Sequence, residues 1–121
     1  MDSLFKALGD NNRLRILNLL RKGELCVCEI EVILDTTQSN VSRHLGKLRN
    51  EGIITYEKKA QWIHYRIDPQ FIEENKLLYH FINEKMDENN KFLMDLTKLT
   101  KYKKSAFTCE NLKEMSEIIF S

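Results

Sequence analysis

Residues 36–67 read TTQSNVSRHLGKLRNEGIITYEKKAQWIHYRI, and the spacing of apolar residues changes once within this stretch. In the first part, the three apolar side chains are Val41, Leu45 and Leu48. At about 100° per residue they fall within about 60° of one another, so they form one narrow stripe. This stripe predicts an amphipathic helix over 38–50.

After Gly52 the pattern becomes typical of strands. Residues 53–56 (IITY) and 62–67 (WIHYRI) are rich in β-branched and aromatic side chains, whereas residues 57–61 between them are mostly polar. Two such runs joined by a polar turn indicate a β-hairpin. We therefore expect a hairpin directly after the helix.

Further helices are predicted on both sides of this unit. Upstream, apolar residues at helical spacing indicate a short helix before Gly9, a second helix that ends at Gly23, and a third over 25–34. Downstream, Pro69 opens a long helix, and the polar residues 87–90 leave open whether it is continuous. The sequence thus predicts a mostly α fold with a β-hairpin wing, which is a winged helix-turn-helix.

The helix over 38–50 carries donors and cations on the face opposite its apolar stripe, and no acid before Glu51. Solvated faces usually mix both signs, whereas a recognition helix needs polar groups for base edges and cations for phosphates. The wing tip adds basic and polar residues that suit the DNA backbone or the minor groove. The DNA-binding candidates are Gln38, Ser39, Asn40, Ser42, Arg43, His44 and Lys47 in the helix, and Lys58, Lys59 and Gln61 in the wing.

Two of the histidines also suit a structural role. His44 borders the apolar stripe and His64 lies in the hairpin, where a histidine more often makes a structural hydrogen bond than a DNA contact. Charge distribution supports the DNA interpretation: residues 36–66 hold six Lys/Arg and two Asp/Glu, whereas residues 67–90 hold two and six, although the net charge of the chain is only +1.

Composition excludes several classes of protein. No apolar run approaches the ~18 residues of a membrane span, and five charged residues within the first fifteen do not fit a signal peptide. We therefore expect a cytoplasmic protein with no membrane partner. Phosphate-binding glycine loops, nucleophile elbows and H-E-x-x-H motifs do not occur, so an enzyme is not expected.

Three segments together resemble the arsenical-resistance repressor (ArsR-type) family of metal-sensing regulators. They are ELCVCEI at 24–30, QSNVSRHL at 38–45 and WIHYRI at 62–67, and the similarity covers about residues 3–70. The resemblance implies a homodimer that dimerises through its terminal helices and represses from an operator with two-fold symmetry. Two recognition helices one DNA turn apart, about 34–36 Å, also require a dimer. Residues 1–90 would form the DNA-binding and dimerisation domain, and residues 91–121 a C-terminal helical extension.

The family also implies that a thiophilic ion releases the DNA, and Cys26 and Cys28 are the candidate ligands. Shared coordination requires a non-helical first turn, because side chains two apart on a helix point to nearly opposite sides. A helix N-terminus is expected to lower the pKa of these thiols. Arsenic-sensing members place a third cysteine where Glu31 stands here, so Cys109 becomes the candidate third ligand. We expect arsenite or antimonite as inducer, and no permanent cofactor.

Several alternatives remain open at this point. The same cysteine pair could serve a cadmium or lead sensor, although the cysteine-bearing N-terminal extension of such members is lacking. The cysteine pair could instead act in a thiol redox sensor, or Cys26 and Cys28 could be two small apolar residues of the core. The fold could also be an interaction domain that no longer binds DNA. A zinc pair of His80 and Glu84 on the long helix is disfavoured as ordinary surface charge.

Overall fold

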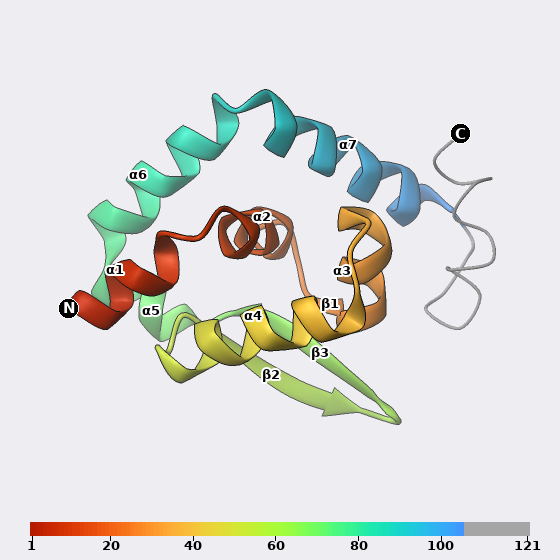
Figure 1. Cartoon of the computed structure of the whole chain (residues 1–121), viewed down its shortest axis with the longest axis horizontal. Coiled ribbons are helices and arrows are strands. Elements are labelled where there is room, and N and C mark those ends of the chain that lie inside the picture. Colours follow the sequence, from red (N-terminus) through yellow and green to blue (C-terminus); the bar gives the residue numbers. More distant parts are fainter. Residues whose placement is uncertain (106–121) are drawn as a thin grey trace.

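The computed structural model describes residues 1–105. Its elements follow the order α1 (Asp2–Leu8), α2 (Asn11–Leu20), β1 (Leu25–Cys26), α3 (Val27–Leu34), α4 (Gln38–Asn50), β2 (Ile54–Lys59), β3 (Trp62–Ile67), α5 (Pro69–Glu74), α6 (Lys76–Asp87) and α7 (Asn90–Lys104). In Figure 1, α6 and α7 arch over one side of α2, and α4 with the β2–β3 hairpin lies on the other side. The predicted winged helix-turn-helix is confirmed.

Local signals set where α2 begins and where α4 begins and ends. The Asp10 carboxylate accepts hydrogen bonds from the backbone N–H groups of Asn12 (2.8 Å) and Arg13 (3.1 Å), which caps α2. The Thr37 hydroxyl accepts from the Asn40 N–H (3.2 Å) and caps α4. Gly52 follows α4 with a φ of 73°, a left-handed conformation that favours glycine.

The sheet contains one strand, β1, that the sequence pattern did not predict. The three strands are antiparallel in the order β1-β3-β2, with Cys26 opposite His64. The prediction of one helix over 25–34 was therefore wrong in its first two residues, which form β1 instead. The first strand of the hairpin is also longer than predicted, because cross-strand pairs continue to Lys59 opposite Trp62 and leave only a two-residue turn.

Residues 69–104 form three helices, so the prediction of one long helix from Pro69 to at least residue 87 was wrong. The first break is at Asn75, whose side chain donates to the Phe71 carbonyl (3.0 Å) in competition with the helical backbone. The second lies at 88–89, where the Asn89 side chain accepts from the Phe92 N–H (3.1 Å) and caps α7. The chain is therefore not one continuous helix through residues 87–90.

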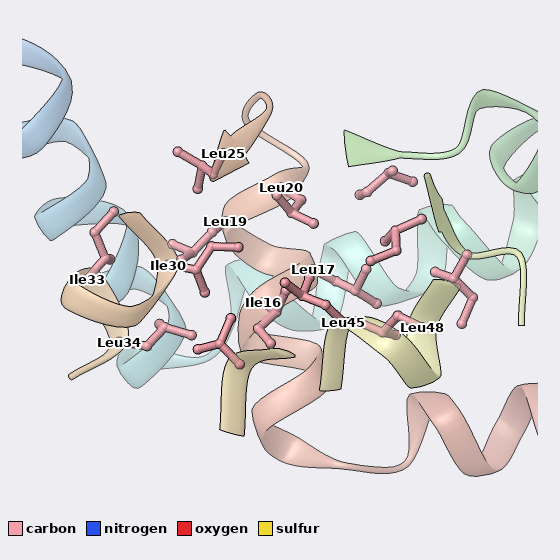
Figure 2. Packing of buried hydrophobic residues seen from close by; sticks show 14 of the residues in the cluster. Ile16, Leu17, Leu19, Leu20, Leu25, Ile30, Ile33, Leu34, Leu45 and Leu48 are labelled. Carbon is pink, nitrogen blue, oxygen red and sulfur yellow. The ribbon is translucent and has the colours of Figure 1, made fainter. Parts of the chain in front are cut away.

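A single apolar cluster joins all the helices and the sheet. Figure 2 shows its centre, to which Leu19 of α2, Ile30 and Ile33 of α3 and Leu45 of α4 contribute. The helix α7, which was assigned to an extension, contributes Phe92, Leu99 and Tyr102 to the same cluster. Burial of each large side chain stabilises the fold by about 1.5–3 kcal/mol.

Polar contacts attach α7 to α2. The Arg15 guanidinium donates two hydrogen bonds to the Asp95 carboxylate, at 2.8 and 3.0 Å, and the Asn18 side chain donates to the Phe92 carbonyl (2.9 Å). Asp95 and Asn18 are both buried. Within residues 1–105, no helix has the length and apolar character needed to cross a bilayer.

Candidate DNA interface and thiol pocket

The helix α4 presents the predicted polar face to solvent. Its apolar stripe is buried against the rest of the domain, as the spacing of Val41, Leu45 and Leu48 predicted. The exposed side chains of the opposite face are Gln38, Ser39, Asn40, Ser42, Arg43 and Lys47. Because this face has cations and hydrogen-bond donors without acids, it has the chemistry that a DNA groove requires.

One cation that the candidate set omitted lies beside this face. The Arg49 guanidinium stands 4.6 Å from the centroid of the Tyr56 ring, a cation–π distance. Tyr56 belongs to β2, so this contact joins the C-terminal part of α4 to the wing. The count of basic residues over 36–66 includes Arg49, and that count was the signal that could have identified it.

The wing carries its predicted polar tip, with Lys58, Lys59 and Gln61 all exposed. The Lys59 ammonium is paired with the Glu24 carboxylate at 2.5 Å. The hydrogen bond from Lys59 lowers the pKa of Glu24, and the same contact raises the pKa of Lys59. Lys59 is thus held toward the base of β1, so it must leave Glu24 to reach a phosphate.

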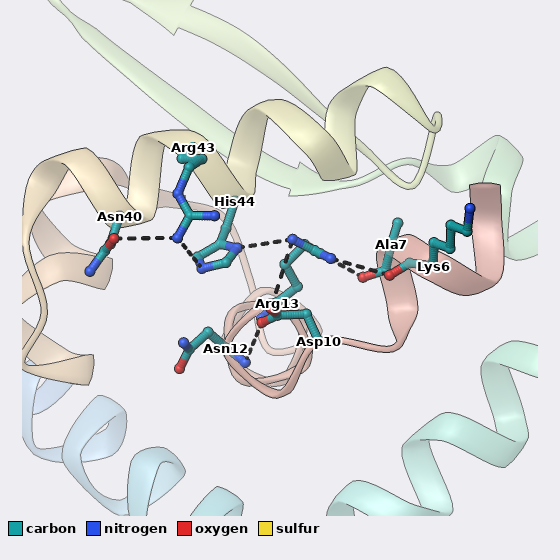
Figure 3. A network of polar contacts seen from close by, with 8 residues as sticks. All are labelled: Lys6, Ala7, Asp10, Asn12, Arg13, Asn40, Arg43 and His44. Atoms are coloured by element: carbon teal, nitrogen blue, oxygen red, sulfur yellow. Dashed lines mark hydrogen bonds and ion pairs between the residues drawn. The ribbon is translucent and has the colours of Figure 1, made fainter.

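His44 differs from the other DNA-binding candidates because it is buried. It is 3% exposed, and its ring points into the domain toward Arg13 of α2, as Figure 3 shows. The distance from Arg13 Nη1 to His44 Nδ1 is 3.2 Å. Burial lowers the pKa of His44, which favours the neutral ring. The prediction that His44 contacts DNA directly is therefore wrong, and its structural alternative describes what it does.

The two cysteines straddle the start of α3. Cys26 is the N-cap residue, with an extended backbone (φ −84°, ψ 163°), and Cys28 is the second residue of the helix. Both line one pocket of about 260 Å³ together with Val27, Glu31, Gln38, Trp62 and Ile63. The non-helical conformation that shared coordination requires is therefore present at Cys26.

The surroundings of Cys26 raise the pKa of its thiol, whereas a helix N-terminus was expected to lower it. Burial, followed by the negative charge of Glu29 and a hydrogen bond to it, raises the pKa of Cys26 to about 11. The Glu29 carboxylate also accepts from the Cys26 N–H (2.7 Å) and from the Tyr102 hydroxyl of α7. The prediction of a lowered thiol pKa was wrong for Cys26, because the burial of its thiol, together with the charge of Glu29, outweighs the effect of the helix end.

His64 is a neighbour of the thiol that sequence reasoning did not place there. Its Nδ1 and Nε2 atoms lie 3.6 and 3.7 Å from Cys26 Sγ, across the β1–β3 pair. Nδ1 is also 3.8 Å from the Glu24 carboxylate. Only the recognition of β1 as a strand would have revealed this contact.

The third candidate ligand, Cys109, lies outside the described residues. Within residues 1–105, His, Cys, Asp and Glu side chains form no group of three that could hold a metal ion. Glu31 lines the thiol pocket from the position where a third cysteine would stand. His80 and Glu84 form an exposed pair at 3.0 Å on α6, as expected of surface charge.

Comparison with known proteins identifies the family. The bacterial regulatory protein, arsR family, matches residues 10–56, from the cap of α2 into β2. The arsenic resistance transcriptional regulator ArsR2 of Pseudomonas putida is 33% identical over 93 residues, which cover 76% of this chain and 78% of that protein. The chain belongs to the ArsR family. It is thus a member of a family of transcriptional regulators rather than of enzymes.

Two further similarities extend this assignment within the ArsR family. The arsenical resistance operon repressor of Escherichia coli is 48% identical over 67 residues, which cover 54% of this chain. The chain spans only 57% of the length of that repressor. Among solved structures, the homodimeric winged helix-turn-helix DNA-binding domain Mb0332 of Mycobacterium bovis has a TM-score of 0.60 and 25% identity, covering 69% of this chain and 78% of that one.

Proposed function

We propose that this ArsR-family chain is a homodimeric repressor that binds operator DNA through α4 and the wing, and dissociates when a thiophilic metalloid or metal ion binds at Cys26 and Cys28. One observation carries the proposal: the pocket of the two cysteines is also lined by Gln38, the first residue of α4, and by Trp62, the first residue of β3. A ligand held in this pocket therefore lies beside both elements proposed to read DNA.

A homodimer is supported by an apolar groove on the side of the molecule away from the wing. The groove has a volume of about 400 Å³ and lies where α1 meets α6 and α7. Phe5 and Phe81 line it and are about half exposed, at 52% and 55%. Exposed apolar patches of this kind mark protein interfaces, and the similar Mycobacterium bovis domain is described as homodimeric. A two-fold dimer in turn requires an operator with two-fold symmetry.

The protonated state of Cys26 favours arsenite over cadmium or lead as the inducer. A divalent cation must displace the proton of each thiol into solvent, and a raised pKa opposes that step. Arsenite at neutral pH is As(OH)₃. When an As–S bond forms, the thiol proton leaves with a hydroxide of the arsenic as water, so no proton enters solvent. The high pKa of Cys26 therefore weakens cation binding without weakening arsenite binding.

Full sulfur coordination of a trivalent arsenic needs three thiols, so the proposed site requires Cys28 in its reduced form, and Cys109 is proposed as the third ligand. Replacement of Cys109 by serine should weaken arsenite binding and release from DNA, while leaving DNA affinity without arsenite unchanged. Unaltered arsenite affinity in this variant would remove Cys109 from the site. Heterodimers that carry one Cys109→Ser protomer and one Cys26→Ser protomer distinguish coordination within a protomer from coordination between protomers.

The redox alternative receives little support from Cys26 and more from Cys28, which is disulfide-bonded in the structure. The thiolate is the form that reacts with oxidants, and a pKa of about 11 leaves little of it at neutral pH. Release of DNA by peroxide but not by arsenite would favour the redox sensor.

The proposed function is tested with a duplex that the protein selects from a random-sequence pool. We expect tight binding at moderate salt, loss of binding on addition of arsenite or antimonite, and no arsenite response in Cys26→Ser or Cys28→Ser. Failure to select any duplex would refute the DNA half of the proposal. A complex that resists arsenite, antimonite, cadmium, lead and zinc would refute the sensing half.

A further inference from the structure

A chain of polar contacts runs from α1 through the interior to the DNA-facing surface of α4. Figure 3 shows it, with Arg13 of α2 at the centre, the last turn of α1 on one side and His44 of α4 on the other. Arg13 and His44 are 8% and 3% exposed, so the contacts are shielded from water. Buried contacts of this kind hold elements at one relative position.

Arg13 uses its guanidinium to bind the end of α1. Nε donates to the Ala7 carbonyl at 2.7 Å, and Nη2 donates to the Lys6 carbonyl at 3.2 Å. The carbonyls in the last turn of a helix lack partners within that helix. The side chain of Arg13 therefore caps α1 from outside and fixes where it ends.

The third hydrogen bond of the Arg13 guanidinium determines the tautomer of His44. Arginine can only donate, so His44 Nδ1, at 3.2 Å from Arg13 Nη1, must be the acceptor. A neutral imidazole then carries its proton on Nε2, which lies 3.4 Å from Arg43 Nη2. His44 Nε2 and Arg43 Nη2 then both bear hydrogens, so they form no hydrogen bond with each other. The Arg43 guanidinium instead donates to Asn40 Oδ1 (3.4 Å).

The two ends of this chain of contacts face the two proposed interfaces. α1 contributes Phe5 to the apolar groove proposed for the dimer, and α4 carries Arg43 on the face proposed for DNA. Apolar packing alone tolerates small rotations of one helix on another, whereas a guanidinium that bridges two carbonyls and an imidazole does not. Two recognition helices must enter successive major grooves at the same time, so the angle between α1 and α4 affects how well both helices fit the DNA.

We propose that Arg13 and His44 are positioning residues that hold the recognition helix at a fixed orientation to α1, and so set how well both half-sites of an operator are engaged at once. This inference rests on the proposed DNA-binding function. It requires neither residue to touch DNA.

The test compares two duplexes: the one selected by the wild-type protein, and a version of it with one half-site scrambled. In His44→Leu, the preference for the intact duplex over the scrambled one should fall at least about tenfold, while affinity for the scrambled duplex stays within about threefold. His44→Gln keeps an acceptor for Arg13 and should restore most of the preference. Arg13→Lys, which keeps the charge but loses the bridging geometry, should behave as His44→Leu does and carries the test if His44→Leu does not fold.

Asp95→Asn is the matched control, because it weakens the buried contact of Arg15 with Asp95 between α2 and α7, and neither residue lines the apolar groove proposed for the dimer. If Asp95→Asn loses the same preference at an equal drop in Tm, or if the preference survives in His44→Leu and Arg13→Lys, the inference is overturned. If the wild-type protein selects no duplex at all, the proposed function fails and the inference falls with it.

Discussion

The affinity of the thiol pocket for cadmium should rise with pH through Cys26, whereas its affinity for arsenite should not. Cys26 is 5% exposed and its pKa is raised to about 11, so it is protonated throughout the range from pH 6 to pH 9. Binding of a divalent cation releases this proton, and the affinity therefore gains about tenfold for each pH unit from Cys26 alone. Arsenite takes up the same thiol with release of water, so its affinity should be flat over this range.

The size of the effect follows from the thiol equilibrium. With a pKa near 11, about one Cys26 in 10⁴ is a thiolate at pH 7, so a pKa raised from 9.0 reduces cation affinity about 100-fold, or by about 2.7 kcal/mol. Glu29 supplies part of this rise through its charge and its hydrogen bond. Glu29→Gln removes the charge but keeps an oxygen for the Cys26 N–H. Cadmium affinity at pH 7 should increase by up to about tenfold in this variant, and arsenite affinity should change by less than about threefold.

Glu31→Gln is the matched control, since Glu31 lies on the same helix and lines the same pocket, whereas Glu29 is the carboxylate of this helix that raises the pKa of Cys26. Isothermal titration with cadmium and with arsenite between pH 6 and pH 9 supplies the measurement. A cadmium affinity that gains less than tenfold per pH unit would mean that Cys26 is already a thiolate. That result, or an equal response of Glu29→Gln and Glu31→Gln, would refute the reasoning.

Other substitutions test the fold and the DNA face. Gly46→Ala should raise the free energy of unfolding by about 1 kcal/mol, because alanine favours a helix and its Cβ meets no neighbour within 4 Å. Gly52→Ala should lower the free energy of unfolding by about 1–2 kcal/mol, because the φ of 73° is strained for alanine. Urea unfolding that shifts both variants in the same direction would contradict these predictions. Asp95→Asn should lower the free energy of unfolding by about 3 kcal/mol, since Arg15 is left without its buried partner, and a loss under 1 kcal/mol in the same assay would not fit. Lys58→Ala should weaken binding to all duplexes alike and reduce the slope of log affinity against log salt by about one, so a change in sequence preference would argue against a phosphate contact.

The parts of the fold that local patterns determine could be predicted from the sequence. The helix α4 has the predicted bounds because an apolar stripe, a Thr37 cap and a glycine stop all act within sixteen residues. The hairpin followed from the change in period after Gly52. For the same reason the exposed polar face of α4 could be listed residue by residue.

What could not be predicted depends on partners distant in the sequence. Cys26 is extended because it pairs with His64, 38 residues away, and two residues are too few to display a strand period. The pKa of Cys26 depends first on the burial of its thiol and then on the nearby Glu29 carboxylate, which a helix-end argument does not include. His44 turns inward because Arg13, 31 residues away, offers it a donor.

The central claim, that a ligand at the thiol pocket releases DNA, is tested most directly by fluorescence anisotropy of the selected duplex bound to the wild-type protein. Addition of arsenite should return the anisotropy to that of free DNA, and Cys26→Ser should hold the duplex at the same arsenite concentration. A complex that arsenite leaves intact, or one that arsenite dissociates equally well in Cys26→Ser, would contradict the account.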